Sequence, residues 1–121
     1  MNIKYEYNNK VENINITNYK FYQNNIYNEK VAEVIKNIMD IRNTITKIYS
    51  IDTIRLIIDK LDNKVKMEIV FNYIDKDNDE HTIEMLFDDS NIHIDLGIYI
   101  QNEKLVKDIK LKYKKISKIL K

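Results

Sequence analysis

The stretch from Val65 to Ile100, VKMEIVFNYIDKDNDEHTIEMLFDDSNIHIDLGIYI, decides the fold. Apolar side chains stand at every second position in three successive runs, over residues 65–73, 83–87 and 92–100. Acidic and Asn-containing segments at 75–80 and 88–91 separate the runs. This alternation is typical of antiparallel strands with one buried face. We therefore predict a β-meander of three strands joined by tight turns.

Two segments with a different period flank this meander. Residues 28–49 place apolar side chains three or four positions apart, which lines one face of a helix, and Asn28 is the expected N-cap. Residues 102–120 repeat the pattern, with Asn102 as the N-cap. Because each helix has one apolar stripe to bury, we expect both to cover the same apolar face of the sheet.

The remaining segments complete an α+β reading. Residues 3–22 alternate loosely and predict one or two strands, with a tight turn at Asn8-Asn9. Residues 51–61 fit either a helix or a strand, and the β-branched cluster at 53–58 favours a strand. We predict one α+β domain over residues 1–121, with an antiparallel meander of four to six strands and two helices.

Composition limits the classes of function. Ile, Asn and Lys supply 57 of the 121 residues, a bias typical of an AT-rich genome, and the chain has one Gly and no Pro or Cys. The lack of Cys excludes disulfides, thiolate metal sites and thiol nucleophiles. Net charge is +1, so bulk charge does not indicate nucleic acid or membrane. With no apolar leader and no long apolar run, we expect a cytoplasmic protein.

The acidic segment has the beginning of a calcium-loop pattern but not its end. Asp75, Asp77 and Asp79 have the spacing of the first three loop ligands. Glu80 stands where the loop needs Gly, and Leu86 stands where it needs a bidentate Glu. We therefore expect a solvated hairpin turn and no metal site.

Catalytic groups are also scarce. A symmetric hairpin places His93 opposite Leu86, and this separates the two histidines, His81 and His93, by roughly 16 Å along the strand, too far for one metal ion. The same register places Glu84 opposite Asp95, where an acid–base role needs burial and the outer sheet face offers only mild repulsion. With a single glycine and no Ser in a nucleophile-elbow context, we predict a protein that is not an enzyme and has no cofactor.

Charge is segregated along the chain. Residues 75–95 hold eight acids against one Lys, and residues 103–121 hold eight lysines against two acids. One interpretation is a solvated edge and a solvated helix. The alternatives are an acidic patch that meets a basic partner surface and a helix that lies on nucleic-acid phosphates. The acidic candidates are Asp75, Asp77, Asp79, Glu80, Asp88 and Asp89, and the nucleic-acid candidates are Lys107, Lys110, Lys114, Lys115 and Lys118.

The first 27 residues hold six of the twelve aromatic side chains, interleaved with Asn. Tyr offers a large amphipathic contact area at low entropic cost, and Asn offers adaptable hydrogen bonds, as in recognition surfaces. Aromatic residues of the core are the alternative. The partner-binding candidates here are Tyr5, Tyr7, Tyr19 and Tyr22.

In size, composition and lack of catalytic groups, the whole chain resembles the small accessory proteins that phages and other mobile elements deploy against host machinery, including anti-CRISPR inhibitors. The resemblance implies a binding protein that blocks the surface of a larger host protein or nucleoprotein complex in the host cytoplasm. The alternative is a nucleic-acid-binding accessory protein that uses its last helix. A homodimer through an exposed strand edge stays open as a further assembly.

Overall fold

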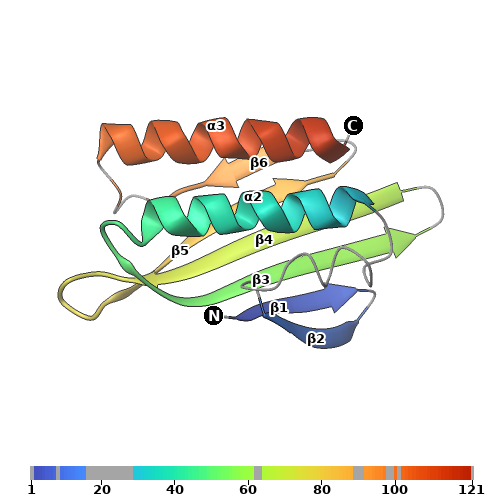
Figure 1. Cartoon of the computed structure of the whole chain (residues 1–121), viewed down its shortest axis with the longest axis horizontal. Helices are drawn as coiled ribbons and strands as arrows, with labels where there is room; N and C mark the ends of the chain where they lie inside the picture. Colours follow the sequence, from blue (N-terminus) through green and yellow to red (C-terminus); the bar gives the residue numbers. More distant parts are fainter. Residues whose placement is uncertain are drawn as a thin grey trace.

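The computed structural model describes residues 2–7, 9–15, 29–61, 64–88, 92–97, 100 and 102–120. Within these residues, six strands form one sheet, and two helices lie over it (Figure 1). The strands are β1 (Asn2–Tyr7), β2 (Lys10–Asn15), β3 (Ser50–Leu61), β4 (Lys64–Ile74), β5 (Glu80–Phe87) and β6 (Ile92–Asp95). The helices are α2 (Glu29–Ile45) and α3 (Glu103–Leu120). The predicted α+β class is therefore confirmed.

The sheet is mixed, with strand order β2-β1-β3-β4-β5-β6. The hairpins β3–β4, β4–β5 and β5–β6 form the predicted meander, and residues 51–61 belong to strand β3 as expected. The expectation of an entirely antiparallel sheet is wrong at one place, because β1 pairs with β3 in parallel. A parallel pair needs a long crossover, which the segment containing α2 supplies.

The core lies on the face of the sheet that the helices cover (Figure 1). Leu56, Ile69 and Met85 are neighbours across β3, β4 and β5, and each is 0% exposed. The two helices complete this core with Val34, Ile35, Ile38, Ile41 and Ile45 from α2 and Leu105, Ile109, Tyr113 and Ile116 from α3. Each such side chain contributes about 1.5–3 kcal/mol when fully buried.

Hydrogen bonds are seen at one end of each helix. The first helix was expected over 28–49, but α2 ends at Ile45, and in the turn that follows the backbone N–H groups of Ile48 and Tyr49 both donate to the Ile45 carbonyl. Asn28 lies outside the described residues. The N-cap at Asn102 is confirmed, since its Oδ1 accepts the backbone N–H of Leu105 at 3.0 Å.

The last strand is shorter than the alternation predicts. It was expected over 92–100, but β6 ends at Asp95. The Asp95 carboxylate accepts the backbone N–H of Gly97 at 2.8 Å, and Gly97 has a φ of 68°, which suits glycine. This local turn directs the chain out of the sheet toward α3. Asn9, with a φ of 71°, similarly confirms the turn expected between the first two strands.

The helices α2 and α3 run side by side in opposite directions (Figure 1). Among the described residues, neither helix is long and apolar enough to cross a membrane. The described part of the opposite sheet face carries no helix, so its outward side chains are set by strand alternation alone (Figure 1).

Candidate functional site: the acidic turn and the outer face of β5 and β6

The turn between β4 and β5 has a defined backbone conformation. The N–H of Asp75 donates to the Asp79 carbonyl at 3.0 Å, and the N–H of Asn78 donates to the Asp75 carbonyl at 3.2 Å. Asn78 has a φ of 64°, a left-handed conformation that Asn adopts more readily than most residues. The acidic segment is therefore a closed turn.

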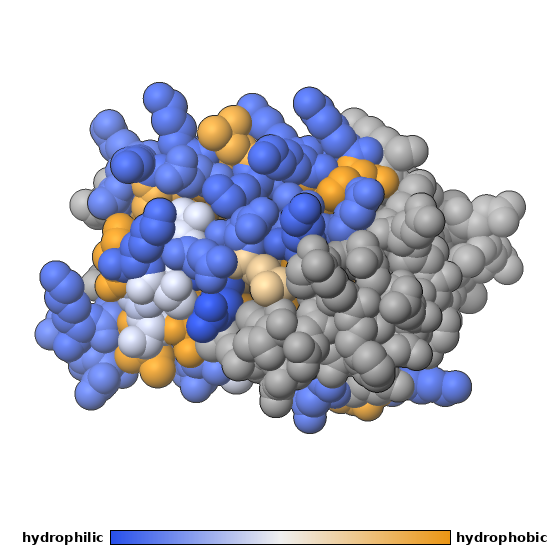
Figure 2. Space-filling model, viewed as in Figure 1, coloured by the Kyte–Doolittle hydropathy of each residue, from blue (hydrophilic) through white to orange (hydrophobic). Residues whose placement is uncertain are grey.

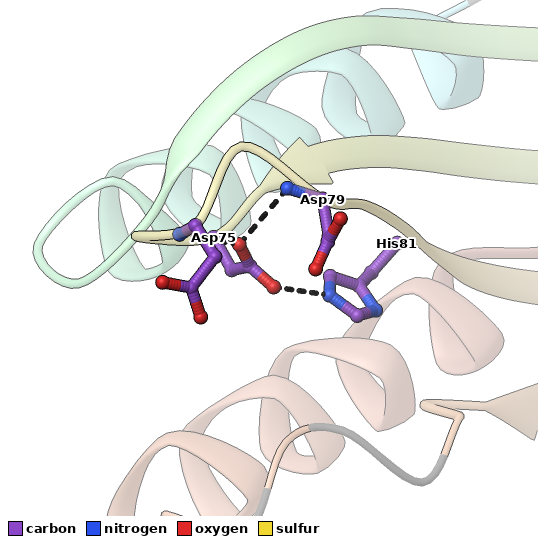
Figure 3. A network of polar contacts seen from close by, with 4 residues as sticks. Asp75, Asp79 and His81 are labelled. Atoms are coloured by element: carbon purple, nitrogen blue, oxygen red, sulfur yellow. Dashed lines mark hydrogen bonds and ion pairs between the residues drawn. The ribbon is translucent and has the colours of Figure 1, made fainter.

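The carboxylate of Asp75 holds this turn from inside (Figure 3). Its Oδ1 accepts the backbone N–H groups of Asp77 and Asp79 at 2.8 and 3.0 Å, and its Oδ2 lies 2.7 Å from Nε2 of His81. Asp75 is 7% exposed. The hydrogen bond with His81 is the main cause that lowers the pKa of Asp75; burial opposes it, and the two backbone donors assist it.

His81 is fixed by its neighbours. Its ring stacks on Tyr73, its partner across the β4–β5 ladder, with ring centroids 5.3 Å apart. Tyr73 in turn lies 5.0 Å from the ring of Tyr49, which follows α2. The histidine side chain is 25% exposed, so it is only partly buried against these neighbours. The ladder register, with Tyr73 opposite His81 and Asp75 two residues beyond, is the sequence signal that would have indicated this contact.

Five acidic side chains are exposed around this turn and on the outer face beyond it. Asp77 and Asp79 lie in the turn, beside the exposed Lys76. Along β5, outward-facing residues alternate with the buried Ile83 and Met85, and two of these outward residues are acidic. Strand β6 adds the fifth acidic residue. We call this set the acidic surface, and its members are Asp77, Asp79, Glu80, Glu84 and Asp95.

Cross-strand pairing brings the acidic surface together on the sheet. Glu84 pairs with Asp95, as the hairpin register predicted, and His93 pairs with Leu86. Two like charges in direct opposition repel each other, and the repulsion is relieved when a cation or a basic side chain approaches. The sheet face therefore offers an attractive place for a positive charge.

The rest of the outer face is electrically balanced. On the β4 side, Asn72 donates to Thr53 at 2.6 Å and accepts from Thr82 at 3.0 Å, which makes a neutral polar ladder. On the β1 side, Arg55 pairs with Glu6 at 2.9 Å. Negative charge on this face is thus concentrated toward β5, β6 and the turn.

The acidic residues predicted from sequence do not form one patch. Asp75 is buried and its carboxylate is engaged within the turn. Asp88 follows the far end of β5, about 27 Å from Glu80 at the rise of an extended strand. It is half-buried, and Asp89 lies outside the described residues. The turn residues Asp77, Asp79 and Glu80 remain together, and Glu84 and Asp95 extend them.

The structure describes two of the four tyrosines in the predicted aromatic surface. Tyr5 is 2% exposed and packs in the core, so its ring is not on the surface. Tyr7 belongs to strand β1, while Tyr19 and Tyr22 lie outside the described residues.

The lysines of α3 form a second charged surface. The helix buries Leu105, Ile109 and Ile116 against the core, so its other side faces away from the sheet. Leu111, 56% exposed, lies among the lysines. The view of the helix side shows hydrophilic side chains over both helices, with small hydrophobic spots between them (Figure 2). The exposed members, which we call the lysine surface, are Lys104, Lys107, Lys110, Lys114, Lys115 and Lys118.

No group of three or more metal-ligating side chains converges within the described ranges. Comparison of the chain with protein families, with curated proteins and with solved structures finds no match.

Proposed function

We propose that this protein is a non-catalytic binding protein that covers a basic surface of a larger partner with its acidic surface. The class we propose is an inhibitor that blocks a host protein or nucleoprotein complex, as a phage or mobile-element anti-defence protein does. The observation that supports this function is the internal hydrogen bonding of the β4–β5 turn by Asp75.

Preorganisation is the reason that this observation matters. A flexible acidic loop loses conformational entropy when it binds, and this loss weakens the complex. Here the backbone N–H groups of Asp77 and Asp79 both donate to a single buried carboxylate, which the His81 side chain also contacts. Glu84 and Asp95 stand on paired strands. The acidic side chains therefore act from an ordered backbone.

Electrostatics gives the proposed complex its rate and its salt dependence. Opposite charges on two surfaces steer encounter and raise association rates at low ionic strength. The Debye length falls from about 30 Å at about 10 mM salt to about 8 Å at about 0.15 M, so the attraction weakens across this range. A basic groove that normally holds nucleic acid is a suitable target for such a surface.

A labelled oligo-arginine peptide is the probe for this proposal. We expect fluorescence anisotropy to show binding of the full chain at about 10 mM salt and weaker binding at about 0.15 M. Asp77→Asn/Asp79→Asn should weaken binding about fivefold, as two exposed contacts of about 0.5 kcal/mol each imply.

The matched control removes two acids from the helix side, where Glu33 and Asp40 are exposed on α2. Glu33→Gln/Asp40→Asn changes net charge equally and should leave affinity for the peptide unchanged. Equal weakening by both double variants would show that net charge, and not the acidic surface, attracts the peptide. That result would overturn the proposal.

The lysine surface favours a second candidate function, binding to the phosphate backbone of nucleic acid. All five lysines predicted from sequence are exposed on α3. The helix has no Arg to read base edges, so binding would be salt-sensitive and without sequence preference. A gel-shift titration at low and moderate salt tests it with single- and double-stranded DNA. No retardation at low salt would reject it.

A further inference from the structure

Three members of the acidic surface, Glu80, Glu84 and Asp95, point away from the lysine surface. Glu84 and Asp95 alternate with residues that the helices cover, so they lie on the face of the sheet opposite α2 and α3. Lys107 and Lys114 lie on α3, which packs over the other face (Figure 1). Because the sheet separates these three acids from α3, one chain cannot bring them together with its own lysines.

The lengths of the two surfaces set the extent of a contact between them. The 18 residues of α3 make a helix about 27 Å long and about 10 Å wide. The eight residues of β5 span about 27 Å with the rise of an antiparallel strand, whereas β6 has four residues and pairs with β5 only at residues 84–87. The acids on these strands lie between Glu80 and Glu84, a distance of about 14 Å, so they can lie along about half of α3 of another molecule.

We propose that the partner of the lysine surface is a second copy of this chain, whose acidic surface receives α3. The contact joins charges of opposite sign and places the exposed Leu111 within it. The proposal does not depend on the proposed function, because it needs only charges that this chain itself carries.

The opposed directions of the two surfaces determine the kind of assembly. A two-fold dimer buries the same patch of both subunits, whereas here one patch of the first molecule meets a different patch of the second. Each added copy leaves one acidic surface and one lysine surface free. The assembly is therefore head-to-tail and grows with concentration unless the rotation between copies closes a ring.

Self-association covers the surface that binds basic partners. At high protein concentration and low salt, neighbouring copies compete for the acidic surface with any basic ligand. The contact relies on exposed charge pairs, so it weakens as salt rises. Pairing of strand edges, in contrast, depends on backbone hydrogen bonds and responds little to salt.

Sedimentation velocity of the full chain tests this proposal. At about 10 mM salt, we expect the weight-average mass to rise above the 14.6 kDa monomer as concentration increases, and to return to it at about 0.15 M salt. Lys107→Gln/Lys114→Gln and Glu80→Gln/Glu84→Gln should each remain monomeric at low salt. Lys36→Gln/Lys47→Gln is the matched control, because it removes two exposed lysines away from α3, and it should associate like the natural sequence.

Mixing the two monomeric variants is the decisive step. The first keeps its acidic surface and the second keeps its lysine surface, so together they form only one kind of contact. We expect a complex that stops at one copy of each. A monomeric natural chain at low salt, a monomeric mixture, or equal loss of association in the Lys36/Lys47 control would each overturn the proposal.

The peptide assay separates this result from the proposed function. Lys107→Gln/Lys114→Gln leaves the acidic surface intact and should bind oligo-arginine at least as well as the natural chain. Head-to-tail assembly without peptide binding would reject the proposed function alone, and peptide binding without assembly would reject this inference alone.

Discussion

Nε2 of His81 and Oδ2 of Asp75 lie 2.7 Å apart, where strand β5 leaves the acidic turn (Figure 3). Six positions separate the two residues in the chain, and the turn brings them together. Through this contact the stacked pair Tyr73–His81 is connected to the backbone of the turn. The conformation of the acidic turn therefore depends on Asp75 and His81, neither of which belongs to the acidic surface.

Removal of the imidazole should destabilise the protein. His81→Ala leaves the buried carboxylate of Asp75 without its side-chain partner, so the melting temperature should fall by about 4 °C, as a loss of about one hydrogen bond implies. His93→Ala is the control, because His93 is exposed on the outer face. Equal melting temperatures for His81→Ala and the natural chain would show that the contact contributes no stability.

The depressed pKa of Asp75 predicts a loss of stability in acid. Its pKa lies below the ordinary 3.8, so the folded state binds this proton more weakly than the unfolded state does. The stability that it contributes is fully present above pH 3.8 and is lost as pH falls through the lower, folded pKa.

Urea unfolding at several pH values below 5 measures this effect. Asp75→Asn keeps an oxygen that can accept the backbone N–H groups of Asp77 and Asp79 but has no proton to take up in this range. The variant should show a flatter decline of unfolding free energy with acid. If the unfolding free energies of the two proteins declined in parallel with pH, Asp75 would not be the source of this loss of stability.

The left-handed turn residue predicts a difference between two small substitutions. Asn78 has a φ of 64°, where a Cβ-bearing residue without a polar side chain costs about 1–2 kcal/mol. Asn78→Ala should therefore lower the free energy of unfolding by about 1 kcal/mol, and Asn78→Gly should change it little. Chemical denaturation of both variants measures this, and equal stabilities would be inconsistent with the turn.

The buried hydroxyl of Tyr113 predicts a gain of stability. It has no hydrogen-bond partner among the described residues, and burial raises the pKa of this phenol. The ring stacks on Phe87 at 5.0 Å. Tyr113→Phe should raise the unfolding free energy by up to about 1 kcal/mol, because it removes an unpaired polar group and keeps the ring.

Tyr113→Ala serves as the opposite control. Loss of the whole ring from the core should cost about 3–5 kcal/mol. A clear loss of stability in Tyr113→Phe, measured by the same denaturation, would show that the hydroxyl has a favourable contact.

The meander could be predicted because its information is local. Alternation from Val65 onward identifies the covered face, and the turn lengths set the register that pairs Glu84 with Asp95. The cap at Asn102 was predictable for the same reason, since it depends on a side chain and an N–H three residues away.

The predictions from sequence were wrong where contacts between distant residues, or local turns, determine the structure. The direction of β1 against β3 depends on the path of a long crossover, which no short pattern records. Apolar periodicity continues past Ile45 and past Asp95, but local turns end both elements. Equal formal charges at Asp75 and Asp77 conceal opposite environments, one buried and one exposed.

By itself, the sequence determined the α+β class, the alternating core face and the segregation of acids from lysines, because these follow from residue type and spacing. Only the tertiary structure decided which acids share a surface, since burial and cross-strand pairing withdrew Asp75, separated Asp88 and brought Glu84 to Asp95. It also placed Glu80, Glu84 and Asp95 on the opposite side of the sheet from the lysines of α3, because successive strand side chains point to opposite faces and the helices cover only one of them.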